Sequence, residues 1–77
     1  MNKISKDKAL EIISHSKGRF LSISGIKKDG SIRHYKSSKF NDIIYSNINV
    51  LTRDGYRNIV PSGIFYLKAD KKEYAVA

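Results

Sequence analysis

Apolar residues near the N-terminus recur at the spacing of a helix. Ala9, Ile12, Ile13 and Ser16 line one side of such a helix, at spacings of three, four and seven from Ala9, and Leu10 lies at the edge of that side;. Ser5 precedes them and has a hydroxyl that can accept a hydrogen bond from a free N–H of the first turn. Gly18 follows them and suits the left-handed conformation that often ends a helix. The pattern predicts one helix over residues 5–17.

The rest of the chain alternates between apolar and polar positions, as half-buried strands do. Two Asp-Gly pairs, Asp29-Gly30 and Asp54-Gly55, interrupt this alternation, and such pairs are a strong signal for a two-residue hairpin turn. With the first pair as the turn, Lys28 lies opposite Ser31. The predicted core face of this hairpin then consists of Leu21, Ile23, Gly25, Ile32 and His34. The predicted outer face consists of Phe20, Ser22, Ser24, Ile26, Arg33 and Tyr35.

The second hairpin follows the same logic. One predicted face consists of Ile48, Val50 and Ile59, with Thr52 and Arg57 further along it, and the other face of Leu51, Arg53, Tyr56 and Asn58. Pro61 lacks an N–H and ends this strand or leaves it at a sheet edge. Two further strands are expected over "IFYLKA" and "EYAVA", joined by "DKK". Residues 37–46 fit either an irregular loop or a short strand.

This order of elements predicts an α+β fold that is mainly β. Residues 1–77 form a single domain, with a helix over about 5–17 and a small five- to six-stranded antiparallel SH3-like barrel over about 19–77. Closure of a barrel removes the sheet edges that invite aggregation, and the helix can cover an open end. The strand over "EYAVA" is expected to leave an exposed edge, where a second copy could pair to give a homo-oligomer.

Two long segments resemble the small SH3-like β-barrel proteins that many bacteriophages encode: "GRFLSISGIKKDGSIRHYK" and "NINVLTRDGYRNIVPSGIFYLKADKKEYAV". The matching residues are Gly18, Phe20, Lys27, Lys28, Asp29, Gly30, Arg33, Gly55, Tyr56, Arg57, Asn58, Ile59, Ile64 and Tyr74. The resemblance covers roughly residues 9–36 and 47–76, fails at "SSKFNDII" and departs at "VPSGIF". It implies a barrel fold and a phage origin, but no activity, because the group has none established.

The charge of the chain is concentrated in one half. The formal net charge is +8, and residues 1–40 hold ten Lys or Arg against three acids. Residues 41–77 hold five bases against four acids. A basic excess of this kind suggests a charged face that attracts nucleic acid, an anionic surface or an acidic protein. Solubility alone is the simpler explanation, because net charge keeps small domains apart.

Several classes of function are disfavoured. The chain has no cysteine, and its two histidines, His15 and His34, stand 19 residues apart. No paired carboxylates, phosphate-binding loop or nucleophile motif is recognisable, so we expect neither an enzyme nor a bound metal or cofactor. The longest apolar run, residues 64–67, is too short for a membrane span. The N-terminus has no apolar signal region, so a cytoplasmic location is expected, in the host cell if the protein is viral.

Basic residues next to aromatic ones mark the candidate binding surface. They cluster in the hairpin "GIKKDGSIRHY" and around Tyr56, and Lys17 and Arg19 would extend the hairpin surface. Cations hold phosphates, while flat rings and guanidinium planes stack on bases, although any one ring can instead serve as a core residue. The candidate binding residues are Lys17, Arg19, Lys27, Lys28, Arg33, Tyr35, Lys36, Lys39, Arg53, Tyr56 and Arg57.

The sequence therefore predicts a small, basic, non-enzymatic binding protein. Its first candidate partner is nucleic acid, held by the basic β-hairpin face mainly through phosphates and with little sequence preference. The alternative is a phage-encoded inhibitor or modulator that binds an acidic surface of a host protein, in host takeover or anti-defence.

Overall fold

Helix α1 spans Lys6–Ser14 in the computed structural model of residues 1–77. Its start confirms the sequence prediction, because the Ser5 side chain accepts a hydrogen bond from the N–H of Lys8 at 3.1 Å. Its end comes three residues earlier than predicted. The Ser16 backbone N–H and hydroxyl both donate to the Ile13 carbonyl, at 3.1 and 2.6 Å, and tighten the last turn;.

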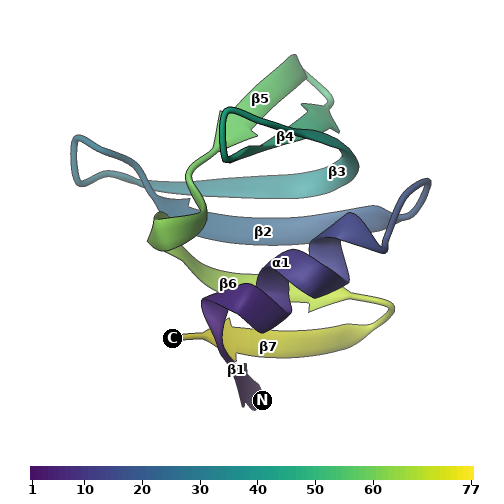
Figure 1. Cartoon of the computed structure of the whole chain (residues 1–77), viewed down its shortest axis with the longest axis vertical. Helices are drawn as coiled ribbons and strands as arrows, with labels where there is room; N and C mark the ends of the chain where they lie inside the picture. Colours follow the sequence, from purple (N-terminus) through teal and green to yellow (C-terminus); the bar gives the residue numbers. More distant parts are fainter.

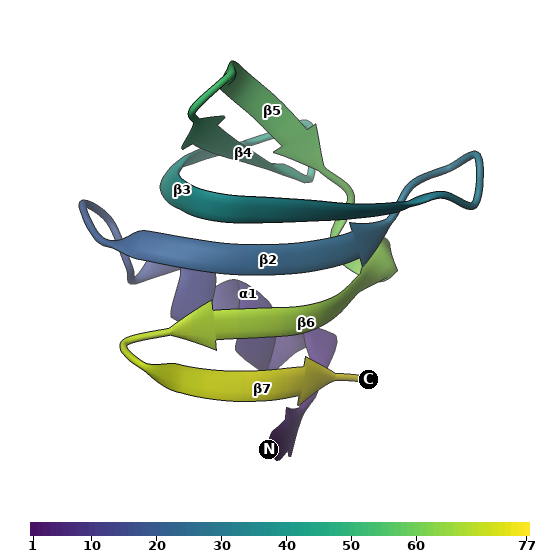
Figure 2. The same ribbon diagram turned by 180° about the vertical axis from the view of Figure 1, so that it is seen from behind.

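Seven strands form a single mixed sheet beside this helix (Figures 1 and 2). They are β1 (Asn2–Ile4), β2 (Phe20–Ile26), β3 (Ile32–Ile44), β4 (Asn47–Thr52), β5 (Gly55–Ile59), β6 (Ile64–Ala69) and β7 (Lys72–Val76), with a short 3-10 helix, η1 (Pro61–Gly63), before β6. The order across the sheet is β1-β7-β6-β2-β3-β4-β5. The mainly-β fold with one helix is confirmed.

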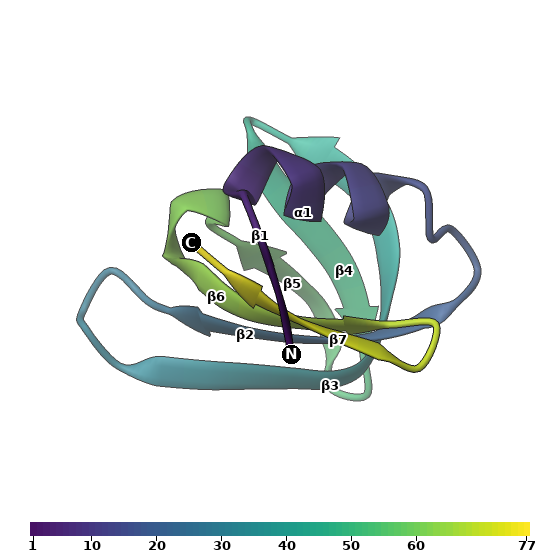
Figure 3. The ribbon, with the colours of Figure 1, turned by 90° about the horizontal axis from the view of Figure 1, so that it is seen from below.

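The sheet curls around the helix but does not close (Figure 3). Strand β5 pairs only with β4, and β1 pairs only with β7, so these two strands are the sheet edges. The predicted edge at β7 is wrong, because β1 pairs with β7 in parallel and occupies that edge. With three residues, β1 is too short to show a strand pattern in the sequence.

Residues 37–46, whose sequence fits either a loop or a short strand, belong mostly to β3, which has 13 residues. Its first half pairs with β2 and its second half with β4, so one strand joins two hairpins. Ser37 lies within the part that pairs with β2 and has a φ of 54°, and a register shift in the pairing with β4 follows between Phe40 and Asp42. Such irregularities bend a strand, which is how β3 turns from one part of the curved sheet to the next.

The first hairpin turns over three residues rather than two. Lys27 N–H donates to Ser31 O at 2.8 Å, and Gly30 N–H donates to Lys27 O at 2.9 Å, with Gly30 at a φ of 89°. A shift of one residue moves every side chain of one strand to the opposite face. Tyr35 therefore lies opposite Ile23 and is 8% exposed, so the predicted outer position of Tyr35 is wrong.

The second hairpin keeps its predicted faces. Its turn residues are Arg53 and Asp54, and Thr52 lies opposite Gly55, which has a φ of 104°. The register thus differs from the predicted one by two residues, a shift that leaves each side chain on the same face. Ile48, Val50 and Ile59 share one face as predicted, and all three are buried.

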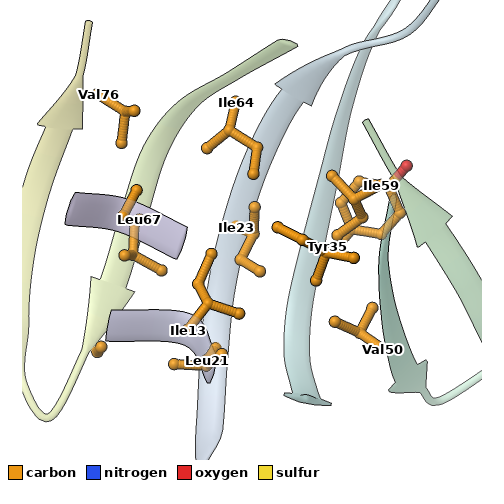
Figure 4. Close-up of a cluster of buried hydrophobic side chains, with 12 residues drawn as sticks. Ile13, Leu21, Ile23, Tyr35, Val50, Ile59, Ile64, Leu67 and Val76 are labelled. Atoms are coloured by element: carbon orange, nitrogen blue, oxygen red, sulfur yellow. The ribbon is translucent and has the colours of Figure 1, made fainter. Parts of the chain in front are cut away.

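The core lies between α1 and the concave side of the sheet (Figure 4). It consists of twelve residues: Ala9, Ile13, Leu21, Ile23, Tyr35, Ile48, Val50, Ile59, Ile64, Leu67, Ala69 and Val76. Ala9 and Ile13 are the two core residues from α1, so the short helix is stabilised by packing and not by its length;.

Candidate nucleic-acid interface

An open cleft of about 460 Å³ lies between the first half of β3 and the β4–β5 hairpin. We call it the basic cleft. Its lining residues are Arg33, His34, Tyr35, Lys36, Ser37, Thr52, Arg53, Asp54 and Arg57. Four of them carry a permanent positive charge at neutral pH, against the single carboxylate of Asp54. The two predicted basic segments, around residues 33–36 and 53–57, therefore form one surface.

The three arginines of the basic cleft come from different parts of the fold. Arg33 lies two residues before Tyr35 on β3, with its guanidinium carbon 5.8 Å from the centroid of the Tyr35 ring. Arg53 occupies the β4–β5 turn, which is closed by Thr52: its hydroxyl donates to Gly55 O at 2.8 Å. Arg57 lies on β5 and donates from Nη1 to the neighbouring Tyr56 carbonyl at 2.8 Å. The main chain thus orients the guanidinium of Arg57, and the Tyr35 ring lies near that of Arg33.

No carboxylate neutralises the cations of the basic cleft. The molecule has two salt bridges, Lys8–Glu11 and Arg19–Asp70, and both lie outside it. In the adjacent hairpin turn, the pKa of Asp29 is lowered because its carboxylate accepts hydrogen bonds from the hydroxyl and N–H of Ser31, at 2.6 and 2.9 Å. The Asp29 carboxylate is thus hydrogen-bonded within its own turn and forms no salt bridge with the cations of the basic cleft. Like charges held together repel each other, and a bound anion relieves this repulsion.

A second hollow of about 440 Å³ adjoins the basic cleft. We call it the side hollow. Its lining residues are Phe20, Ser37, Lys39, Leu51, Thr52 and Arg53, of which Ser37, Thr52 and Arg53 also line the basic cleft. Lys39 Nζ lies 4.8 Å from the centroid of the Phe20 ring. The side hollow therefore combines an aromatic ring with cations and is continuous with the basic cleft.

The tip of the β2–β3 hairpin forms a third hollow, of about 320 Å³, with the end of β5. Lys27 and Lys28 line it together with Asp29, and Tyr35 lines both this hollow and the basic cleft. The predicted hairpin lysines thus lie next to the basic cleft rather than within it. Tyr35 itself is buried, so its ring is a core residue and not a free stacking surface.

The remaining predicted residues lie elsewhere. Arg19 directly precedes β2 and Lys27 directly follows it, so they lie at opposite ends of this strand. Arg19 donates two hydrogen bonds to the Asp70 carboxylate, at 3.0 and 2.9 Å, and is already paired. Lys17 lies in the same connection between α1 and β2. The expected extension of the hairpin surface by Lys17 and Arg19 is therefore wrong.

One contact that the sequence did not suggest joins Ser24 and His34. The Ser24 hydroxyl lies 2.6 Å from His34 Nδ1, because the shifted register places these residues opposite each other on β2 and β3. His34 is exposed, so its predicted place on the core face is wrong. A hydroxyl next to an imidazole is also how a serine nucleophile meets its base, but such a serine needs access to substrate and its base needs a further group that orients it. Ser24 is only 6% exposed, and no side chain other than Ser24 hydrogen-bonds to His34.

No group of three His, Asp or Glu side chains in the molecule is arranged to hold a metal ion. None of its helices has the length and apolar character needed to span a membrane. Comparisons of the chain with protein-family models, with curated proteins and with solved structures found no match.

Proposed function

We propose that this chain is a non-enzymatic nucleic-acid-binding protein that holds phosphates in the basic cleft. The observation that supports the proposal is the meeting of four cations without ion-pair partners in one open cleft: Arg33, Lys36, Arg53 and Arg57. They come from two segments far apart in the sequence, and the fold holds them together despite their mutual repulsion.

The chemistry of these side chains suits phosphate groups. Three of the four are arginines, whose planar guanidinium groups form paired hydrogen bonds to phosphate oxygens. The net charge of +8 adds a long-range attraction to any polyanion;. Phosphate contacts fix the position of a strand but do not read its sequence. We therefore expect binding with little sequence preference and a strong dependence on salt.

The proposal is tested with a fluorescein-labelled DNA strand of about 16 nucleotides, which spans one binding site. The cleft variant carries Arg33→Ser, Arg53→Ser and Arg57→Ser. The control variant carries Lys3→Ser, Lys6→Ser and Lys72→Ser, which removes the same charge from β1, α1 and β7, outside the basic cleft. Fluorescence anisotropy at one fixed salt concentration gives the Kd of each.

We expect the cleft variant to bind at least about tenfold more weakly than the control variant, because each lost phosphate contact also loses its counterion release. Equal losses in the two variants would show that the net charge, and not the basic cleft, attracts the strand. Absence of binding by the unaltered protein, to DNA and to RNA, would overturn the proposal. That result would favour the alternative partner, an acidic surface of a host protein.

A further inference from the structure

We propose that the side hollow and the exposed rings next to it stack on unpaired bases, so that the protein selects single strands over duplexes. This inference rests on the proposed function and specifies its ligand. It comes from the pairing of strands β2 to β5, which sets four side chains in a row on the outer face of the sheet.

The row is defined by direct opposition between neighbouring strands. Phe20 lies opposite Lys39, Lys39 opposite Leu51, and Leu51 opposite Tyr56. Directly opposite residues in antiparallel strands project from the same face. We call these four residues the outer row. Phe20 is 65% exposed, Leu51 41% and Tyr56 58%. The row thus presents two aromatic rings and one aliphatic side chain to solvent.

The composition of the outer row points to bases. Side chains of this size are usually buried, and an exposed group of them next to a polar rim marks a binding surface. Stacking on a ring is available to every base, because every base has a flat π-face. Lys39 lies over the Phe20 ring and supplies a cation within the row. A surface that alternates rings and cations matches a strand that alternates bases and phosphates.

The position of the outer row relative to the basic cleft favours a single strand. Arg53, Ser37 and Thr52 line both the cleft and the side hollow, so a strand held in the cleft by its phosphates passes directly into the hollow. Phe20 and Tyr56 are separated by three strand spacings, or roughly 14 Å at about 4.8 Å each. One base cannot cover both rings, so they are separate stacking sites. In a duplex the faces of the bases are already stacked on each other and cannot contact either ring.

The test compares three probes of about 16 nucleotides and one sequence: a DNA strand, an RNA strand and the DNA duplex. The ring variant carries Phe20→Ser and Tyr56→Ser. A second version with Leu at both positions keeps apolar surface but removes the rings. The matched control is Phe65→Ser, which removes an exposed aromatic ring of β6 outside the outer row. Thermal unfolding confirms that each variant is folded.

We expect the unaltered protein to bind a single strand more tightly than the duplex. The single strand with the lower Kd, DNA or RNA, identifies the sugar of the ligand. Both ring variants should bind the single strand more weakly, by at least about fivefold for each of the two rings removed. Their affinity for the duplex, and the affinity of the Phe65 control for the single strand, should be unchanged. Unchanged single-strand binding by the ring variants overturns the inference. If the cleft variant is still impaired in that case, the proposed function stands; if the cleft variant is also unimpaired, both fail.

Discussion

The backbone of Gly63 lies so close to β2 that a Cβ atom on Gly63 would overlap the carbonyl oxygen of Ile26. The approach is reciprocal, since a Cβ atom on Gly25 would lie 3.3 Å from Gly63 O. This contact places η1 against the end of β2, where the β2–β3 turn that carries Lys27 and Lys28 begins (Figure 1). Only a residue without a side chain allows it.

Replacing Gly63 with Ala should therefore destabilise the protein. The added methyl group has to push main chain away from main chain, and overpacking of this kind typically costs about 1–3 kcal/mol. Urea unfolding followed by circular dichroism measures the change. The matched control is Ser62→Ala, at the exposed neighbouring position, which should be close to neutral. An unchanged unfolding midpoint for the Gly63 variant would show that η1 moves freely away from β2.

The sequence predicted those features of the fold that depend on local patterns. The capping hydroxyl of Ser5 located the start of α1, and the faces of the β4–β5 hairpin were correct because an error of two residues preserves them. The β2–β3 hairpin was wrong by one residue. Its Asp-Gly pair forms part of a three-residue loop, and the pair alone does not distinguish that loop from a two-residue turn;.

Strand β3 could not be predicted from pattern because its irregularities fall on residues without a signal. Ser37, Tyr45 and Ser46 all have positive φ, although none of them is Gly or Asn. The sequence left residues 37–46 open between a loop and a short strand, whereas β3 continues to Ile44 and the turn follows at Tyr45 and Ser46. Pairing with both β2 and β4 determines the conformation of this segment and outweighs its local sequence preferences;.

The candidate site was predicted residue by residue but not as a surface. Arg33, Lys36, Arg53 and Arg57 were all named from the sequence, and their meeting in one cleft depends on the bend of β3. Phe20 and Leu51 were not among the candidate residues named from the sequence. Part of the signal was present, because Phe20 was assigned to an outer face and Leu51 to the face opposite Ile48 and Val50. Their connection through Lys39 requires the pairing of the second half of β3 with β4.

The positive φ values of the β3–β4 turn can be tested by substitution. Tyr45 and Ser46 form a two-residue turn with φ values of 50° and 66°, the region that type I′ turns require and that Asn-Gly suits best;. Tyr45 is exposed and leaves no packing behind. Changing the pair to Asn-Gly should stabilise the protein by about 1 kcal/mol, measured by urea unfolding.

The β4–β5 turn is the control for that change. Arg53 and Asp54 occupy the equivalent turn positions without positive φ, so Asn-Gly at these two positions should give no gain. A similar gain at both turns would mean that the gain does not come from relief of the positive φ values at Tyr45 and Ser46.

Alkaline pH should weaken the β6–β7 hairpin through Tyr66. Its hydroxyl donates a hydrogen bond to the Glu73 carboxylate at 2.8 Å, and this bond, with desolvation and the negative charge of Glu73, raises the pKa of Tyr66 above its ordinary value of 10.0. A raised folded-state pKa gives stability that is complete below the unfolded pKa and is lost as the pH rises through the folded one. The unfolding free energy should therefore fall in this alkaline range.

Lysines titrate in the same range, so the prediction concerns the difference between the protein and its Tyr66→Phe variant. That difference in unfolding free energy, from urea titrations at neutral and alkaline pH, should shrink as the pH rises. Glu73→Gln is the second comparison, because it removes the charge that favours the neutral phenol. A difference that stays constant across the range would contradict the role assigned to this hydrogen bond.

The hairpin tip and the basic cleft make separate predictions for binding. Lys27 and Lys28 line the hollow beside the cleft, whereas Arg53 and Arg57 line the cleft itself. Each pair carries two charges, so Lys27→Ser with Lys28→Ser and Arg53→Ser with Arg57→Ser are matched changes. We expect the arginine pair to weaken binding of a DNA strand more, because both guanidinium groups line the cleft and can form paired hydrogen bonds to phosphate oxygens;.

The salt dependence of Kd identifies the reason for any loss. For a single strand, the slope of log K against log salt should flatten by about 0.7 for each phosphate contact removed. The arginine variant should therefore lose about twice that amount, while the lysine variant keeps most of the slope of the unaltered protein. Thermal stability should stay nearly unchanged in both, because all four side chains lie outside the core. The reverse order of losses would place the phosphate contacts at the hairpin tip and not in the basic cleft.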